Sequence, residues 1–102
     1  MNFLTEAFAH KDALLSFRRM LHQNPEIGLK LPFTTDAVSA ALTERNIAHK
    51  RVLGGIIATI GKPEGRRILL RGDMDALPIQ EKTELPFASQ NGAMHACGHD
   101  LH

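Results

Sequence analysis

The chain has 102 residues, enough for one small domain, and its hydrophobic fraction of 43% and charged fraction of 23% are ordinary for a globular protein. Twelve basic against eleven acidic residues give a net charge of +1 with interspersed signs, which argues against the clustered basic face of a nucleic-acid-binding protein. No apolar run approaches the roughly 20 residues of a membrane span, and the N-terminus does not resemble a secretory signal, so we expect no membrane partner and a cytoplasmic location.

The first part of the chain is predicted to be helical. Apolar residues recur between residues 3 and 23 at spacings of three, four and seven, which indicates one amphipathic helix. His10 lies on the apolar stripe and is expected to pack there. Pro25 ends the helix, because the residue before a proline is pushed away from helical geometry.

A second helix is predicted to begin at Thr34 or Thr35, either of which can act as its N-cap. Asp36 would then lie in the first turn, where a negative charge is favourable. Asn46 is the expected stop. The helices are therefore separated by a loop that contains Pro25.

Short segments rich in Ile, Val and Leu follow at residues 50–53, 55–60 and 67–71. They are predicted to be strands, the second and third forming a hairpin across the Pro/Gly-containing turn at residues 62–65. Residues 68–70 are apolar without alternation, which predicts a central strand covered on both faces. Helices followed by strands indicate an α/β or α+β domain with a mixed sheet.

Two carboxylates, Asp73 and Asp75, stand one residue apart where the predicted buried strand ends. Open α/β sheets bind ligands at the carboxyl ends of their strands, so this is a candidate site. The polar stretch at residues 79–92 is predicted to be irregular, with Phe87 as its anchor.

Residues 94–102 hold three of the six histidines and the only cysteine. Cys97 and His99 are two apart, so in extended backbone their side chains would point to one side and converge on a metal ion. Sulfur and nitrogen donors favour zinc or another late first-row metal. His95, Asp100 and His102 are the nearby candidates to complete such a set.

A plainer interpretation of these residues stays open. A lone cysteine such as Cys97 is usually a small buried apolar side chain. His95 and His102 could be ordinary loop histidines. Asp73 and Asp75 could cap a turn or pair with the arginine at position 71.

Three motifs resemble those of the metal-dependent amidohydrolases, which include hippurate hydrolases, N-acyl-amino-acid amidohydrolases and N-acetyldiaminopimelate deacetylases. Residues 71–79 read Arg-Gly-Asp-Met-Asp-Ala-Leu-Pro-Ile, and residues 94–100 read Met-His-Ala-Cys-Gly-His-Asp. Upstream, residues 18–26 read Arg-Arg-Met-Leu-His-Gln-Asn-Pro-Glu. The resemblance covers essentially the whole chain.

The resemblance implies a zinc-peptidase-like α/β enzyme of two domains, with residues 1–102 as the truncated N-terminal portion of the catalytic domain. It implies two divalent metal ions per subunit (zinc, manganese, cobalt or nickel), with Cys97 and His99 as ligands. Asp75 falls on the aspartate that orients a ligand and tunes the general base. Asp73 stands where related zinc peptidases carry a ligand histidine, and the resemblance assigns no job to His22 and Glu26.

The sequence departs from the family pattern at Leu101, where relatives commonly have glycine, and in length. The general-base glutamate, the remaining ligands and the lid domain, through which a parent would form a homodimer, lie beyond this point in relatives. We therefore expect a fragment that is inactive by itself. The expected parent activity is metal-dependent hydrolysis of the amide bond of small N-acyl amino acids. The alternatives are a hydrolase with Cys97 as nucleophile and a non-enzymatic metal-binding or interaction module.

Overall fold

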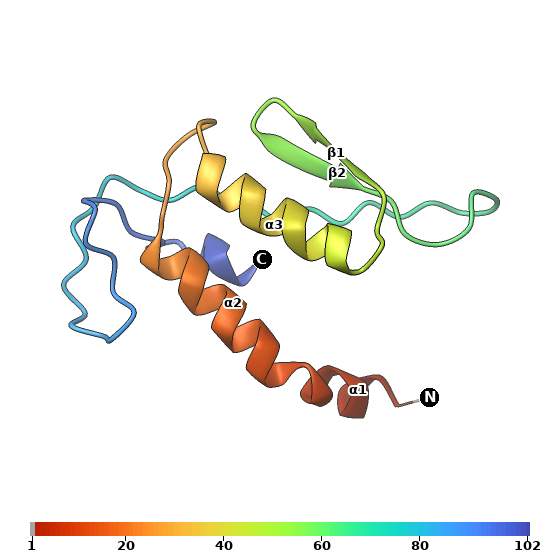
Figure 1. Ribbon diagram of the computed structural model, residues 1–102, viewed down its shortest axis with the longest axis horizontal. Helices are drawn as coiled ribbons and strands as arrows, with labels where there is room; N and C mark the ends of the chain where they lie inside the picture. The colour runs from red at the N-terminus through yellow and green to blue at the C-terminus, as the bar shows by residue number, and fades with distance from the viewer. Residues whose placement is uncertain (1) are drawn as a thin grey trace.

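The N-terminal helix is interrupted at His10. The computed structural model describes residues 2–102, and in it α1 (Phe3–Ala9) and α2 (Lys11–Gln23) flank that residue (Figure 1). The backbone N–H of His10 donates to the carbonyl of Ala7 at 3.1 Å, a tight final turn that ends α1. His10 is exposed, so the prediction that it packs on the apolar stripe is wrong.

The next helix, α3 (Pro32–Glu44), begins earlier than predicted, and its first turn is capped from a distance. Thr34 and Thr35 lie buried inside that turn and do not cap it. Instead, the Glu26 carboxylate accepts hydrogen bonds from the backbone N–H groups of Phe33 at 3.1 Å and Thr34 at 2.6 Å. A carboxylate at a helix N-terminus satisfies free donors and complements the helix dipole. This contact gives Glu26 a role that the sequence did not reveal.

The predicted stop of α3 is confirmed. Asn46 has a φ of 55°, in the left-handed region that commonly ends helices. Its N–H donates to the carbonyl of Thr43 at 3.0 Å, and the N–H of Ile47 reaches back to Leu42 at 2.9 Å. This pair of bonds is a Schellman motif, which satisfies carbonyls that the helix end would leave free.

The hairpin forms between the first two predicted strands. β1 (His49–Val52) and β2 (Gly55–Ala58) pair antiparallel across the two-residue loop Leu53–Gly54. Both loop residues have positive φ, 49° and 83°, as a type I′ turn requires. The predicted pairing of residues 55–60 with 67–71 is therefore wrong. The two-residue turn closes a much shorter loop than the Pro/Gly turn would.

Leu53→Asn is expected to raise the free energy of unfolding by about 0.5–1 kcal/mol, because asparagine tolerates the left-handed region far better than leucine. Leu53 is 86% exposed, so little packing is lost. Chemical denaturation would measure the change. Leu53→Ala keeps the strained φ and is the matched control. An equal gain for both variants would show that the strain is not the cause.

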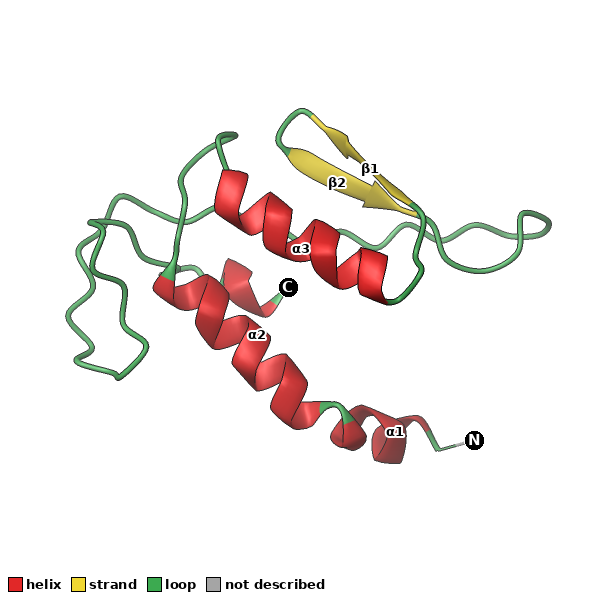
Figure 2. Ribbon diagram, viewed as in Figure 1, coloured by secondary structure: helices red, strands yellow, loops and turns green. Residues whose placement is uncertain are grey.

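Residues 68–70 do not form the predicted buried strand. Their side chains are 82% to 91% exposed, and the chain from residue 59 to residue 98 is drawn as loop (Figure 2). A strand requires a neighbour to accept its backbone hydrogen bonds. Within residues 2–102 no strand lies alongside this segment. The apolar side chains of residues 68–70 are therefore not covered by any other part of the described chain.

The loops are tied together by a few backbone contacts. Both strands of the hairpin pack on α3, and the C-terminal one-turn helix η1 (His99–Leu101) packs on α2. Leu77 and Met94 exchange two backbone hydrogen bonds of 2.9 Å, and Ala76 donates to Glu26 at 2.7 Å. These bonds bring the two candidate site loops together.

No helix of the described residues has the length and apolarity to cross a bilayer.

Candidate metal centre

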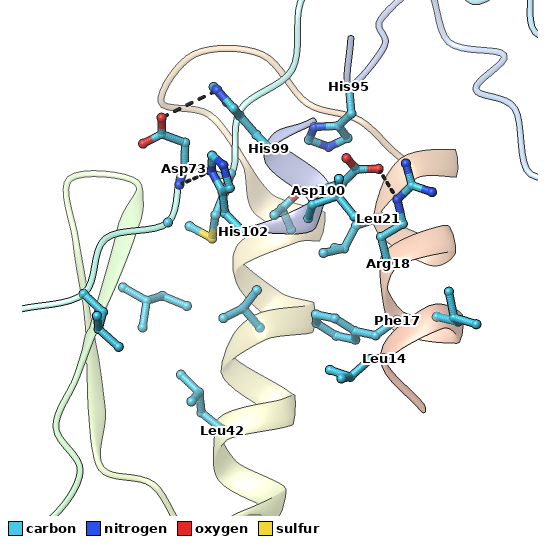
Figure 3. A pocket seen from close by; sticks show the side chains of 18 of the residues that line it. Leu14, Phe17, Arg18, Leu21, Leu42, Asp73, His95, His99, Asp100 and His102 are labelled. Atoms are coloured by element: carbon cyan, nitrogen blue, oxygen red, sulfur yellow. Dashed lines mark hydrogen bonds and ion pairs between the residues drawn. The ribbon is translucent and has the colours of Figure 1, made fainter. Parts of the chain in front are cut away.

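Five of the candidate residues line one open cavity of about 1000 Å³ (Figure 3), whereas Cys97 and Asp75 are not among its lining residues. One wall is apolar and comes mainly from the N-terminal helices and α3. The other wall carries polar side chains from the two loops that the Leu77–Met94 bridge joins. These polar residues are Asp73, His95, His99, Asp100 and His102.

The structure brings His99 and Asp75 together. The Nδ1 atom of His99 lies 2.9 Å from the Asp75 carboxylate and 3.0 Å from its backbone carbonyl. Both partners are acceptors, so Nδ1 carries the proton and donates. The lone pair is then on Nε2, the arrangement of a metal-ligating histidine oriented by a carboxylate. The contact joins Asp75 to His99, while the role of Asp75 in orienting a metal ligand stays a prediction.

Asp73 has other partners. Its carboxylate pairs with Arg71 at 2.6 Å and lies 3.6 Å from Nε2 of His99, beyond hydrogen-bond distance. Its backbone N–H donates to Nδ1 of His102 at 3.3 Å, and the His102 ring stacks on His99 with centroids 5.3 Å apart. Asp73 is therefore an ion-pair partner of Arg71, as the plainer interpretation expected.

Cys97 is an exposed free thiol, so the interpretation as a buried apolar side chain is wrong. Across residues 2–102, no group of three or more His, Cys, Asp and Glu side chains is placed to hold a metal ion. His102 stacks on His99, but these side chains do not form a metal-holding group with Cys97 among the described residues. The Cys97 sulfur and the His99 imidazole have the donor chemistry of zinc ligands, but no contact among the described residues joins the two side chains.

His95 is not an ordinary loop histidine. It is 5% exposed, and neither ring nitrogen has a hydrogen-bond partner in the described chain. Burial lowers the pKa of His95, although the nearby Asp100 carboxylate opposes that effect. The neutral ring lies with its centroid 6.4 Å from that of His22.

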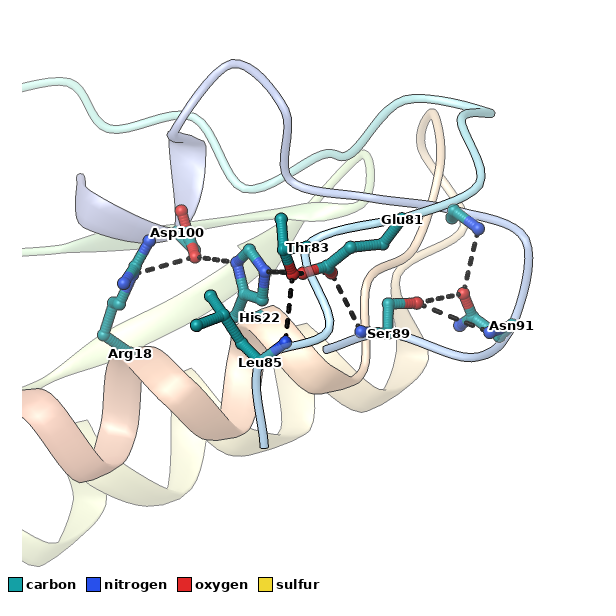
Figure 4. Close-up of polar contacts among 9 residues, drawn as sticks. Arg18, His22, Glu81, Thr83, Leu85, Ser89, Asn91 and Asp100 are labelled. Carbon is teal, nitrogen blue, oxygen red and sulfur yellow. Dashed lines mark hydrogen bonds and ion pairs between the residues drawn. The ribbon is translucent and has the colours of Figure 1, made fainter. Parts of the chain in front are cut away.

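A buried polar network behind the site was missed by sequence reasoning (Figure 4). The imidazole of His22 lies between two carboxylates, with Nδ1 2.7 Å from Asp100 and Nε2 3.0 Å from Glu81. Arg18 approaches the same Asp100 oxygen at 3.0 Å. Phe87, predicted as an anchor, packs edge-on against His22 at 5.6 Å. The only sequence signal was the motif at residues 18–26, which gave no partner.

Glu81 is held as a carboxylate by its contacts. Burial by itself would raise its pKa, but hydrogen bonds from the Thr83 hydroxyl, the Ser89 N–H at 2.9 Å and His22 together lower the pKa of Glu81 below its ordinary 4.5. This carboxylate therefore ties the loop at residues 81–89 to α2.

Comparisons with known proteins identify sequences similar to this chain. Residues 69–102 match the model of peptidase family M20/M25/M40. The N-acetylcysteine deacetylase of Bacillus subtilis is 46% identical over 94 residues, which cover 87% of this chain and 25% of that protein. The N-acetyldiaminopimelate deacetylase of Lactococcus lactis is 41% identical over 96 residues, with the same coverage.

The fold has a matching solved structure. A dinuclear metal-binding M20-family peptidase from Bacillus subtilis superposes with a TM-score of 0.82 at 44% identity, over 92% of this chain and 28% of that one. The predicted fold class, the N-terminal part of such a peptidase fold, is confirmed. The chain spans about a quarter of the length of the relatives it matches.

Proposed function

Because this chain has the sequence and fold of the N-terminal part of the M20 peptidases, we propose that it serves metal-dependent hydrolysis of the amide bond in N-acyl amino acids. Residues 1–102 would form the N-terminal portion of the catalytic domain. The observation that carries the proposal is the contact between His99 Nδ1 and Asp75. It directs Nε2 away from Asp75, at 3.6 Å from the Asp73 carboxylate, and the accessible thiol of Cys97 lies two residues earlier in the chain.

In this function Cys97 and His99 would be metal ligands, and Asp75 would orient His99. The thiolate brings negative charge and the imidazole a neutral nitrogen. The Asp75 carboxylate fixes the tautomer of His99 and increases its basicity. A bound divalent ion supplies Lewis-acid polarisation of the scissile carbonyl and lowers the pKa of water.

The metal and substrate follow from donor chemistry and from the relatives. The solved relative binds two metal ions, and sulfur with nitrogen favours zinc, with manganese, cobalt and nickel as the other candidates. Deacetylases among the relatives act on N-acetylated amino acids, which supports a small N-acyl amino acid as substrate. Hippurate is a further candidate of the same class.

The remaining ligands and the general base would come from the part of an M20 fold that these residues do not span. The same holds for a lid domain and a dimer surface. Two donors bind a catalytic metal weakly, so the 102-residue chain alone is expected to hydrolyse no N-acyl amino acid. We also place the protein in the cytoplasm.

The alternative with Cys97 as nucleophile lacks its base. A nucleophilic thiol needs an imidazole within hydrogen-bond reach. No contact in the described residues joins Cys97 to a histidine, and His99 Nδ1 is engaged by Asp75. This geometry favours the metal-ligand role of the sulfur.

A chimera tests the proposal. Residues 1–102 would replace the matching segment of the Bacillus subtilis N-acetylcysteine deacetylase, and hydrolysis of N-acetyl amino acids would be followed by amine release. We expect activity that a chelator abolishes and that zinc, manganese or cobalt restores, because the ion supplies the polarisation. The chain alone serves as the inactive comparison.

Mild thiol alkylation separates the two roles of Cys97 in the same chimera. With metal loaded, alkylation should leave activity in place, because the sulfur is occupied as a ligand. Activity that survives complete metal removal but is lost on alkylation would refute the proposal and support the nucleophile.

A further inference from the structure

We propose that His22 is a positioning residue for the candidate metal centre, which it serves by fastening Asp100, and with it the turn that carries His99, to α2. The inference rests on the proposed function insofar as His99 is taken as a ligand. His22 itself lies behind the site and does not contact Cys97, His99 or Asp75 among the contacts of the described residues.

His22 is only 4% exposed, and both of its ring nitrogens have a polar partner. Each ring nitrogen faces a different carboxylate, at 2.7 Å for Asp100 and 3.0 Å for Glu81. Both carboxylates are inaccessible to solvent. An imidazole donates from both nitrogens only when each carries a proton, so the geometry fits an imidazolium between two anions, with charge-assisted hydrogen bonds on both sides.

Asp100 transmits this fastening to the site because it is adjacent to His99 in the single turn of η1. In Figure 3 the two side chains leave the turn on opposite sides, His99 toward Asp73 and Asp100 toward Arg18. The turn begins at Gly98, with φ of 81°, and is closed by two backbone hydrogen bonds of 3.0 and 3.1 Å. Such a short element has little stability of its own.

His99 is therefore positioned from two directions. Its imidazole is oriented by Asp75, and its backbone is fixed through Asp100 by His22 and Arg18. Loss of His22 would leave two buried carboxylates without the cation between them, a costly arrangement that movement of the C-terminal turn can relieve. The expected consequence is a misplaced His99 rather than an unfolded chain.

Cobalt binding to the 102-residue chain measures that displacement. Titration with Co²⁺, followed by the sulfur-to-cobalt charge-transfer absorbance of Cys97, gives an apparent dissociation constant. His22→Gln and Asp100→Asn are each expected to weaken binding about ten-fold, at the lower end of the loss seen when outer partners of metal ligands are removed. Both substitutions break the His22–Asp100 contact. The double variant should therefore have an apparent dissociation constant for cobalt no higher than that of the single variant that binds less tightly.

Two controls separate positioning from general destabilisation. His10→Gln changes an exposed histidine and should bind cobalt as the unaltered chain does. Ala40→Gly destabilises α3 at an exposed position that does not line the site cavity, because glycine in a helix interior loses more conformational freedom than alanine. It should lower the melting temperature without weakening cobalt binding. If Ala40→Gly and His22→Gln weaken cobalt binding equally, the positioning role is overturned.

Nitrogen-15 NMR of the imidazoles tests the inference without metal. In the unaltered chain we expect both nitrogens of His22 to give protonated signals and only Nδ1 of His99 to do so. In His22→Gln the His99 signals should lose this single-tautomer pattern. Absence of cobalt binding by the unaltered chain, with this NMR change present, would count against the proposed function alone. An unchanged His99 pattern in His22→Gln would overturn the positioning role.

Discussion

Cys97→Ala and His99→Ala are each expected to abolish amide hydrolysis in the chimera, leaving only the rate without metal. Each removes a donor from a partial set of two, and a catalytic metal is held by about three protein ligands. The effect on folding should be small, because Cys97 is exposed and His99 is partly exposed. The measurements are the hydrolysis rate, the bound metal per chain and the melting temperature.

His102→Ala is the matched control for this pair. It removes an exposed imidazole from the same loop, stacked on the His99 ring at 5.3 Å. Its partner is a backbone N–H, so we expect the rate and the bound metal to change by no more than a few-fold. Near-normal turnover in Cys97→Ala or His99→Ala would show that the ligand assignment is incorrect.

Glu81→Gln is expected to lower the free energy of unfolding by about 2–3 kcal/mol at neutral pH, the scale of breaking charged hydrogen bonds in a buried site. The substitution removes the charge that faces His22. The new amide NH₂ group would also face the Ser89 N–H or the Thr83 hydroxyl. Both of these groups donate to Glu81, so two donors would meet without an acceptor. Chemical denaturation of the 102-residue chain measures the difference.

The pH dependence of that difference follows from the lowered pKa of Glu81. Between the folded pKa and the ordinary value of 4.5, the unfolded chain binds the proton and the folded chain does not. The contribution of Glu81 is therefore fully present above about pH 4.5 and is lost as the pH falls through the folded pKa. The gap between the unaltered chain and Glu81→Gln should shrink in acid.

Glu84→Gln is the control on the same loop, because Glu84 is exposed. It should leave stability within about 0.5 kcal/mol of the unaltered chain, as is usual for surface changes. A gap for Glu81→Gln that stays constant from pH 7 to pH 3 would mean that the charge of Glu81 is not what stabilises the network.

The local features that the sequence predicted correctly depend on a few adjacent residues. The stop at Asn46 is an example, since a left-handed residue after a helix satisfies the last carbonyls by local hydrogen bonds. The site loops at residues 71–79 and 94–100 were also identifiable, because their residue types are rare in that combination. The same local reasoning assigned the hairpin to the wrong pair of strands. Its turn places Leu53 at a positive φ, a conformation that leucine rarely adopts, so no residue preference indicated it.

Sequence by itself thus determined the composition class, the helical first half, the end of α3 and the two loops that carry Asp75, Cys97 and His99. Only the tertiary structure decided that Asp75 meets His99, that Glu26 caps α3, and that His22 joins Asp100 to Glu81. The physical reason is separation along the chain. The His22–Asp100 contact spans 78 residues, and no periodicity or cap rule extends over that distance. Such pairings are chosen by the burial of charges that need partners, which becomes apparent only when the chain has folded.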